Sequence, residues 1–214
     1  MSRRPELDPE AMVLEARRRR IDEVISNRTR TLTVVLDQLE DTFNMAAVVR
    51  TCEAMGLQEV HVVKNPDFPW QPHPRVSLGC EKWLDLVFHE TWWDCSRHLR
   101  ERGFAIWASA VREDKKSLWE LRFDGKVALV FGNERLGVSE EALATADGIF
   151  WLPMLGFTQS LNVSAAVCAS VSRAVSWRHE RLGRVGDLAE GDAQALTDRF
   201  LRLSVKQSEK IFGK

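Results

Sequence analysis

Apolar runs of strand length alternate with segments of helix length through the middle of the chain, and this alternation constrains the fold more than any other feature. The strand-like runs are residues 32–36, 59–63, 84–88, 105–108, 127–131 and 149–152. Helices are expected at residues 44–56, 92–102, 139–145 and 164–181. Strands that alternate with helices form parallel sheets that the helices cover. The sequence therefore predicts an α/β fold with a parallel sheet.

The two ends of the chain predict helices outside this domain. Asp8-Pro9-Glu10 is typical of a helix start, and the helix that follows presents an arginine face at residues 17–20. Near the other end, a final amphipathic helix carries Leu196 and Phe200. We therefore expect three segments: a basic helical extension at 1–30, an α/β domain at 31–181 and a C-terminal helical extension at 182–214.

Residues 64–79 contain four prolines and predict a long loop. Pro66, Pro69, Pro72 and Pro74 each lack the backbone donor that regular structure uses. A loop of this length inside a compact domain is usually functional or mobile. We expect a lid that faces the substrate.

Charge is spread unevenly along the 214 residues, although the formal net charge is only −1. Residues 1–30 and 172–214 carry an excess of Lys and Arg, whereas the middle of the chain is acidic. This asymmetry favours contacts between the ends and a polyanion, although arginine-rich helices also occur as plain solvated faces. The candidates for phosphate contacts in the first segment are Arg17, Arg18, Arg19, Arg20 and Arg28.

Neither a membrane segment nor a metal site is indicated. No apolar run reaches the roughly 18 residues that a membrane span requires, and the N-terminus lacks the apolar stretch of a signal peptide. Cys52, Cys80, Cys95 and Cys168 are scattered without CxxC spacing or nearby paired histidines. We therefore expect a cytoplasmic protein with reduced cysteines, no disulfide framework and no metal.

The segment from Pro153 to Ser164 is the most informative for function. It runs straight into an Ala/Val-rich helix and places Ser160, Asn162 and Ser164 just before helical N–H groups that lack intrahelical partners. This pattern predicts a polar site at the mouth of a helix. Taken singly, each hydroxyl could be a capping group and Asn162 a turn residue.

Two other polar segments belong to the same α/β pattern. Gly132-Asn133-Glu134 follows an apolar strand, where open α/β sheets bind cofactors, although the glycine could serve only a tight turn. Asn44 opens an earlier helix and could be its N-cap. Arg50 has apolar neighbours on that helix, so we expect its guanidinium close to buried surface with an anionic partner, or in an intramolecular ion pair. The chain lacks a phosphate loop and a GxGxxG motif, which disfavours nucleotide hydrolysis and dinucleotide redox chemistry.

In this order, Asn44 to Arg50, Gly132-Asn133-Glu134 and Ser160 to Ser164 resemble the three motifs of the TrmH-type ribose 2′-O-methyltransferases of the SPOUT (α/β-knot) class. The resemblance covers nearly the whole chain, including Arg50 to Gly56 and Gly137 to Leu143, and its helical flanks indicate the tRNA branch. The chain departs from the family at Phe157-Thr158 and at Cys80-Glu81.

The resemblance implies a parallel-sheet α/β trefoil-knot domain that binds S-adenosyl-L-methionine, works as a homodimer and methylates a ribose 2′-hydroxyl of tRNA, the D-loop guanosine at position 18. The implied catalytic residues are Arg50, Asn44, Glu134, Ser160 and Asn162. The implied cofactor contacts are Ser109, Gly132, Leu152, Met154 and Leu161, and Arg178 corresponds to an arginine that the family also uses, here assigned to RNA binding. The alternatives are a ribosomal-RNA ribose methyltransferase and an RNA-binding protein of the same fold that has lost catalysis.

Overall fold

The structure, a computed structural model, describes residues 9–71, 73–133 and 135–212. The chain divides into two compact units. One consists of Thr29–Val185, and the other joins Met1–Arg28 to Gly186–Lys214. Within the described residues, no helix has both the length and the apolar character that crossing a membrane requires.

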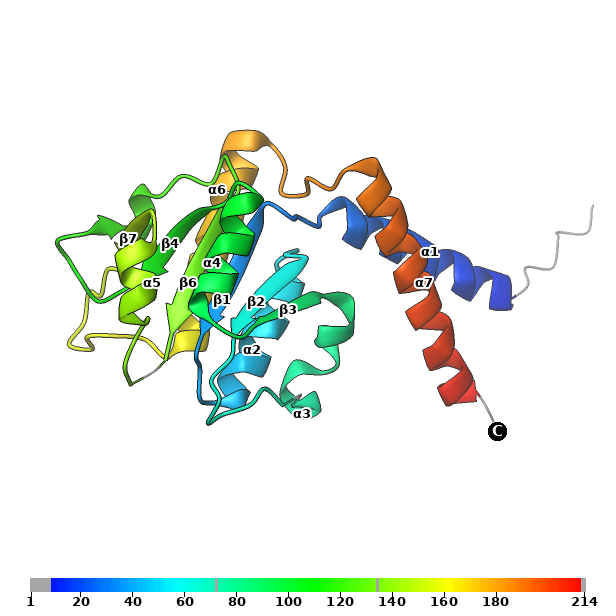
Figure 1. The fold of residues 1–214 in the computed structure, drawn as a ribbon. Helices are drawn as coiled ribbons and strands as arrows, with labels where there is room; N and C mark the ends of the chain where they lie inside the picture. Colours follow the sequence, from blue (N-terminus) through cyan, green and yellow to red (C-terminus); the bar gives the residue numbers. More distant parts are fainter. Residues whose placement is uncertain (1–8, 72, 134, 213–214) are drawn as a thin grey trace, which may run out of the picture. The chain divides into compact units, whose positions relative to one another are not determined.

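A seven-stranded parallel sheet forms the centre of the larger unit, in the order β3-β2-β1-β6-β4-β7-β5 (Figure 1). The strands are β1 (Leu32–Asp37), β2 (Glu59–Val63), β3 (Asp85–His89), β4 (Ala105–Ser109), β5 (Lys116–Ser117), β6 (Val127–Gly132) and β7 (Gly148–Trp151). β1 and β6 are buried along their whole length, because each lies inside the sheet and is covered on both faces. Their register places Asp37 beside Gly132 at the carboxyl ends of the two strands.

Helices cover both faces of this sheet. They are α2 (Thr42–Ala54), α3 (Pro74–Ser77), α4 (Trp92–Glu101), α5 (Glu140–Thr145) and α6 (Val163–Leu182), with short 3-10 turns η1 (Cys80–Trp83) and η2 (Leu118–Glu120). α2 and α6 pack against each other, and their apolar residues share one core cluster with β1, β2 and β6. α4 and α5 contribute to a second cluster, with Val35, Ile106, Ala128 and Val130 of the sheet. The result is a three-layer α/β unit.

The sequence predicts this layout well but misses its short elements. The six expected strands are confirmed to within a residue or so at each end, whereas the two-residue strand β5 is not anticipated. The expectation that residues 64–79 contain no regular structure is wrong in part, because Pro74–Ser77 forms one helical turn. Proline suits the first position of a helix, since its missing N–H has no intrahelical partner there.

The smaller unit pairs the two ends of the chain. Its helices α1 (Pro9–Ser26) and α7 (Glu190–Phe212) pack together around the buried side chains of Ile21, Ile25, Leu196 and Phe200. Gly186 lies directly against the Ser26 backbone, where an added Cβ would come within 2.0 Å of the carbonyl oxygen. The two extensions expected from the sequence therefore belong to one compact unit.

Candidate active site

Asn162 joins the start of α6 to the first turn of α2. It is the N-cap of α6, and its Oδ1 accepts hydrogen bonds from the Ser164 backbone N–H at 2.9 Å and from the Ser164 hydroxyl at 2.6 Å. Its Nδ2 donates to Oδ1 of Asn44 at 3.0 Å. Two of the residues that the sequence assigns to one site, 118 positions apart, are thus in direct contact.

The N-caps of α2 and α6 are not the residues that the sequence suggested for these roles. α2 begins at Thr42 and its N-cap is Asp41, whose side chain accepts from the Phe43 backbone N–H at 2.8 Å. The N-cap interpretation of Asn44 is therefore wrong, and its side chain is available to bind Asn162. Ser160 lies before the α6 cap and is exposed. Asn162, interpreted as a possible turn residue, takes the capping role instead.

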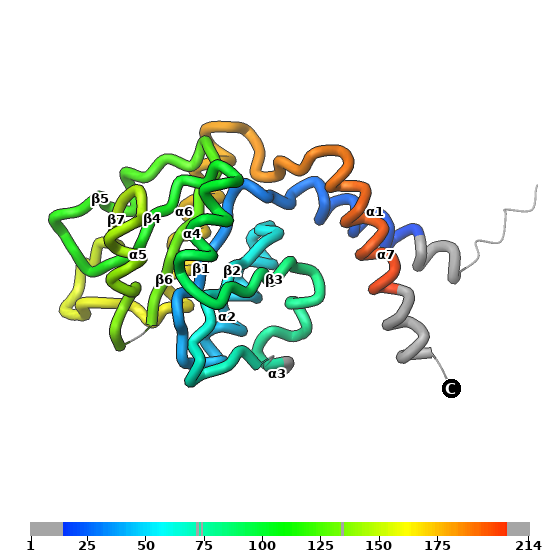
Figure 2. Tube along the Cα trace, in the orientation of Figure 1, coloured from blue at the N-terminus to red at the C-terminus, as the bar shows by residue number. Residues whose placement is uncertain are grey.

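A cleft of about 640 Å³ lies at the carboxyl ends of β4, β6 and β7, bounded by the loops that follow these strands and by the start of α6. Figure 2 shows the trace after β7 running back toward the end of β6 before α6 begins. The cleft is lined by all five residues expected to contact a cofactor, Ser109, Gly132, Leu152, Met154 and Leu161, and by Ser160 and Asn162. The carboxyl edge of a parallel sheet is where such folds bind their ligands, and the volume is in the usual range for a small-molecule site.

Gly132 is required by the packing of the backbone itself. A Cβ at this position would lie 2.1 Å from the Gly137 carbonyl oxygen and 2.2 Å from the Val138 nitrogen. The intervening loop doubles back on the end of β6, with the Gly137 N–H donating to the Asn133 carbonyl at 2.8 Å and Gly137 at φ 75°. The tight-turn interpretation of this glycine is confirmed, and the same turn forms one wall of the cleft.

Asn133 organises that wall, and the sequence analysis did not assign it a role. Its side chain is 7% exposed, and its Oδ1 accepts from the backbone N–H groups of Arg135 and Leu136 at 2.8 and 3.2 Å. An Asn directly after a strand-ending glycine is a recognisable turn signal. The cationic lining residues Arg112 and Arg135 were also missed, since nothing in their spacing marks them.

Asp37 fastens the same loop to the end of β1. Its Oδ2 accepts from the Ser139 backbone N–H at 2.8 Å, while its Oδ1 has no hydrogen-bond partner among the described residues. Burial raises the pKa of this carboxyl, the hydrogen bonds from Ser139 oppose the shift, and the charge of Glu141 adds to it. A carboxylate at this depth is costly unless it is satisfied, so Asp37 restrains the loop at the expense of stability.

The Arg50 guanidinium does not lie close to buried surface, as its apolar helical neighbours suggested. The side chain is exposed, and it forms no ion pair with any residue that the structure describes. The expectation of a guanidinium held against buried surface is therefore wrong. At 3.6 residues per turn, the six positions from Asn44 rotate Arg50 by roughly 120° from it around the helix. Arg50 is not among the described residues that line the cleft.

The charge of Arg50 acts on the thiol of Cys80. Burial raises the pKa of this thiol, the charge of Glu53 adds to the shift, and the Arg50 guanidinium opposes it. Arg50 is thus an exposed cation on the outer surface of α2, beside the η1 turn. Glu134, the acidic member of the expected site, lies outside the described residues.

Arg178 is a structural residue, which corrects its assignment to RNA binding. The side chain is 2% exposed. Its Nε donates to the Phe123 carbonyl at 2.9 Å, its Nη1 donates to Thr29 Oγ1 at 2.9 Å, and its Nη2 donates to the carbonyls of Thr31 and Gly125 at 3.1 and 2.9 Å. These bonds tie α6 to the loops that flank β1 and β6 and leave no surface for a phosphate.

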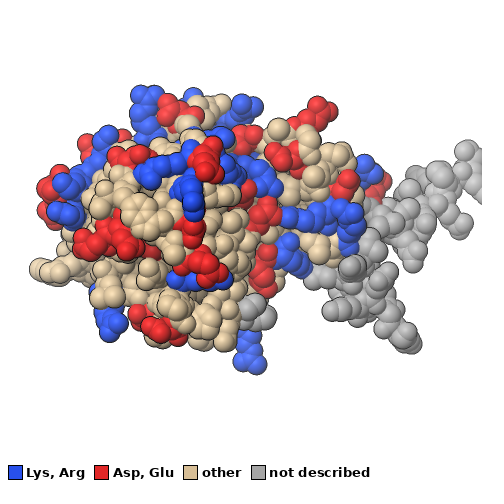
Figure 3. Space-filling model, in the orientation of Figure 1, with Lys and Arg blue, Asp and Glu red and all other residues tan. Residues whose placement is uncertain are grey.

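Arg28 also differs from the expectation for RNA binding. It is 1% exposed, within the unit formed by the chain ends, and its guanidinium lies 5.8 Å from the centre of the Phe200 ring. The arginines at 17–20 are exposed, and two of them also pair within α1, Arg19 with Glu15 and Arg20 with Glu23. On the face drawn in Figure 3, Lys and Arg side chains lie interspersed with Asp and Glu side chains.

Comparison with known proteins identifies the family. Residues 31–171 match the model of the SpoU rRNA Methylase family. The chain is 44% identical over 160 residues to a tRNA (guanosine(18)-2′-O)-methyltransferase of Thermus thermophilus, a match that covers 75% of this chain and 82% of the relative. It is 34% identical over 199 residues to the enzyme of the same name from Borreliella burgdorferi, covering 93% and 90%.

Similarity to a solved structure supports the same family. The crystal structure of the TrmH/SpoU tRNA modifying enzyme of A. aeolicus superposes with a TM-score of 0.81 at 29% identity, over 90% of this chain and 98% of the other. The match therefore extends beyond the α/β unit. The motifs, the fold and these similarities together show that the chain belongs to the SpoU methylase family, as a TrmH-type member of the SPOUT methyltransferases.

Proposed function

We propose that the protein transfers a methyl group from S-adenosyl-L-methionine to the ribose 2′-hydroxyl of guanosine 18 in the D loop of tRNA. The observation that carries the proposal is the cleft at the carboxyl ends of β4, β6 and β7, which gathers the five expected cofactor residues beside the Asn44–Asn162 contact. Its relatives carry this activity in their names.

The lining of the cleft suits the cofactor. Leu152, Met154 and Leu161 offer apolar contacts, while the bend at Gly132 brings backbone groups close to a ligand. S-adenosyl-L-methionine supplies an electrophilic methyl group on its sulfonium. The residues of the chain bind and orient the two reactants.

Arg50 acts as a cation in this proposal. Arginine side chains stay protonated in proteins, so Arg50 is not suited to act as the base. As a cation it clamps a phosphate that flanks the target ribose and stabilises the alkoxide that forms as the 2′-hydroxyl loses its proton. The substrate phosphate or a water molecule accepts that proton. Asn44 and Glu134 orient the ribose and Arg50, while Ser160 and Asn162 shape the floor of the site.

These roles of Arg50 and the cleft are compatible with a homodimer. Arg50 is exposed on α2 and stands outside the cleft of its own chain, so the reacting groups need a further surface to meet. In the family, the active site is completed where two knotted subunits pack together. We therefore propose that the chain has the trefoil knot and that a second copy of the chain completes the site.

The exposed arginines at 17–20 supply contacts to the tRNA backbone that do not depend on sequence. Backbone contacts of this kind set affinity and leave the choice of nucleotide to the site. Because tRNA is the substrate, we place the enzyme in the cytoplasm.

The test is a methylation map. The full chain is incubated with labelled S-adenosyl-L-methionine and, in separate reactions, with an unmodified tRNA transcript, the same transcript carrying 2′-deoxyguanosine at position 18, and ribosomal RNA. We expect label only in the first reaction, with one modified ribose at position 18. Label in ribosomal RNA alone would support the ribosomal alternative, and cofactor binding without label in any RNA would support a protein that has lost catalysis.

A further inference from the structure

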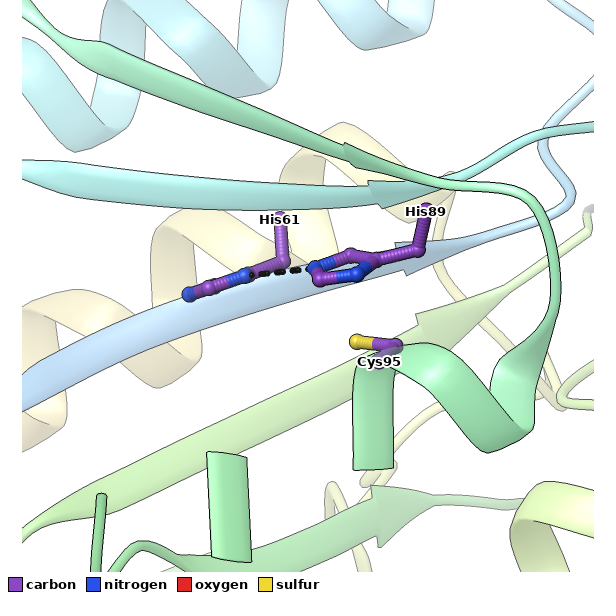
Figure 4. A group of neighbouring side chains, drawn as sticks. All are labelled: His61, His89 and Cys95. Atoms are coloured by element: carbon purple, nitrogen blue, oxygen red, sulfur yellow. Dashed lines mark hydrogen bonds between the residues drawn. The ribbon is translucent and has the colours of Figure 1, made fainter. Parts of the chain in front are cut away.

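Three buried side chains with nitrogen or sulfur donors converge between β2, β3 and α4. They are His61, His89 and Cys95, which are 0%, 8% and 0% exposed, and their donor atoms all lie within 4.8 Å of one another. Figure 4 shows the two imidazole rings side by side, coming from neighbouring strands, with the Cys95 side chain on the adjacent helix. None of the three lines the cleft, so methyl transfer gives no reason for them.

The spacing of the two histidines fits one ion. His61 pairs with Val87 in the sheet, so His89 lies two residues further along and on the same face. Nδ1 of His61 and Nε2 of His89 are 3.0 Å apart. Two nitrogens bound to the same tetrahedral zinc ion are about 3.3 Å apart, given Zn–N bonds of about 2.0 Å. A hydrogen bond between the rings explains this distance as well, so the distance alone does not decide between the two.

The far side of the His61 ring fits a metal-bound imidazole. Its Nε2 is buried and has no hydrogen-bond partner in the part of the chain that the structure describes. Oε2 of Glu59 lies 3.7 Å away, and Arg102 holds this carboxylate at 2.7 Å while Arg30 binds its other oxygen. A fixed carboxylate behind a histidine is the usual outer partner of a metal-binding imidazole, because it selects the tautomer that leaves the other nitrogen free for the ion.

We propose that His61 Nδ1, His89 Nε2 and Cys95 Sγ form a binding site for a borderline-soft divalent cation of the zinc type. Two imidazoles and a thiolate select zinc over magnesium or calcium, which prefer oxygen ligands. His98, one helical turn beyond Cys95, has its ring centre 5.5 Å from those of both histidines, but its Nε2 lies 3.1 Å from Nη1 of Arg102. The site therefore takes three ligands from the chain and leaves the fourth tetrahedral position to a solvent molecule.

Such an ion has a structural role. It fixes α4 to β2 and β3 at one end of the sheet order, on the face opposite to α2 and α6. The sequence expectation of no metal rests on cysteines that lack CxxC spacing and nearby paired histidines, and only the fold brings His61 next to His89 and Cys95. Because the site is apart from the cleft, its occupancy is independent of the proposed methyl transfer.

The experiment measures zinc and cobalt binding to the full chain after chelator treatment under reducing conditions. The background carries Cys80→Ser and Cys168→Ser, which removes the half-buried and exposed thiols. We expect one Zn²⁺ per chain, a higher melting temperature with Zn²⁺ but not with Mg²⁺, and a thiolate-to-Co²⁺ charge-transfer band with tetrahedral visible bands.

Single substitutions in that background identify the ligands. Cys95→Ala should abolish the charge-transfer band, and both Cys95→Ala and His89→Gln should weaken Zn²⁺ binding by more than the roughly 10- to 100-fold that removal of an outer partner costs. Cys52→Ala, at another fully buried cysteine, is the matched control and should leave the band unchanged. Circular dichroism of the metal-free variants shows which of them are folded.

Two outcomes overturn the proposal. One is a folded, reduced protein that binds no Zn²⁺, which leaves the histidine pair as a buried hydrogen bond. The other is Zn²⁺ binding and a cobalt band that persist unchanged in folded Cys95→Ala and His89→Gln variants.

Discussion

The side-chain amide of Asn162 donates a hydrogen bond to Asn44 at 3.0 Å while its oxygen caps α6. One residue therefore fixes the start of α6 and connects it to the first turn of α2. Since Asn162 also lines the cleft, helix capping and the geometry of the cleft depend on the same side chain. Loss of either amide should affect both stability and cofactor binding.

Asn162→Ala and Asn44→Ala should each destabilise the protein. The first change removes an N-cap, worth about 0.5–2 kcal/mol, and the link to Asn44, whereas the second removes the link. In a double-mutant cycle, the two changes should couple by about 0.5–1.5 kcal/mol. Chemical unfolding of the four proteins at one fixed concentration tests this. Strictly additive losses of stability would show that the hydrogen bond contributes nothing to it.

Gly132→Ala should disrupt the cleft. Its Cβ would meet the backbone of residues 137–138 at 2.1–2.2 Å, and neither strand nor loop can move away without breaking the turn. Such overpacking costs typically about 1–3 kcal/mol, and we expect at least a tenfold loss of cofactor affinity by calorimetry. Gly125→Ala is the control, because nothing lies within 4 Å of its added Cβ. Normal cofactor affinity in Gly132→Ala would contradict the placement of the cofactor.

The sequence predicts the sheet because its strands are long and apolar, and local patterns suffice for such elements. Residues 127–131 are apolar throughout, as a strand covered on both faces requires. β5 has only two residues and forms through its partner β7, so no local pattern marks it. The sequence places the start of α2 two residues late because Asp41 and Asn44 are both good capping residues, and the choice between them depends on tertiary contacts.

The candidate site was predictable where a residue acts on its own local turn, as Gly132 does at the end of β6 and Asn162 does as the cap of α6. The burial of a charged side chain was not predictable, because it depends on which other elements pack over that side chain. Arg50 has apolar helical neighbours and is exposed, whereas Arg178 lies in the polar C-terminal part of α6 and is buried against four carbonyl and hydroxyl oxygens. Sequence periodicity predicts which residues share a face of a helix. It does not predict which other part of the chain covers that face.

Asp37→Asn should stabilise the metal-free protein at pH 7 and much less at pH 4. Burial raises the pKa of Asp37 above its ordinary value of 3.8, so the folded state binds a proton more tightly than the unfolded state. The contribution of Asp37 is therefore fully present below the unfolded pKa and is lost as the pH rises through the folded pKa. An amide escapes this loss and can still accept from the Ser139 N–H.

Unfolding at the two pH values, in chelator, tests this pH dependence. The ionisable groups that act on Asp37 are Glu141 of α5 and the Cys95 thiol of α4, and neither changes in the variant. Asp37→Ala is the control, because it removes the acceptor and should destabilise at both pH values. A pH-independent difference between Asp37→Asn and the original protein would contradict the raised pKa.

Replacing the four arginines at 17–20 by alanine should flatten the salt dependence of tRNA binding. For every phosphate that is no longer neutralised, the slope of log K against log salt falls by about 0.9 for duplex and about 0.7 for single strands. Alanine keeps the helix, and Ile21 and Ile25 still pack in the terminal unit. Binding at several salt concentrations measures the slope, and cofactor affinity should not change. An unaltered slope would mean that this arginine face is only solvated.

Arg50→Ala should lower the single-turnover rate of methylation by about 10²- to 10⁴-fold, the usual range for a transition-state donor. Arg50→Lys should stay strongly impaired, because an ammonium cannot form the planar two-pronged contact with a phosphate. Both variants should bind the cofactor normally, since Arg50 is exposed and outside the cleft. Arg122→Ala is the matched control at an exposed arginine that pairs with Asp124. Single-turnover rates at saturating tRNA test this prediction. A nearly normal rate in Arg50→Lys would show that charge alone suffices. A nearly normal rate in Arg50→Ala would remove Arg50 from the chemistry.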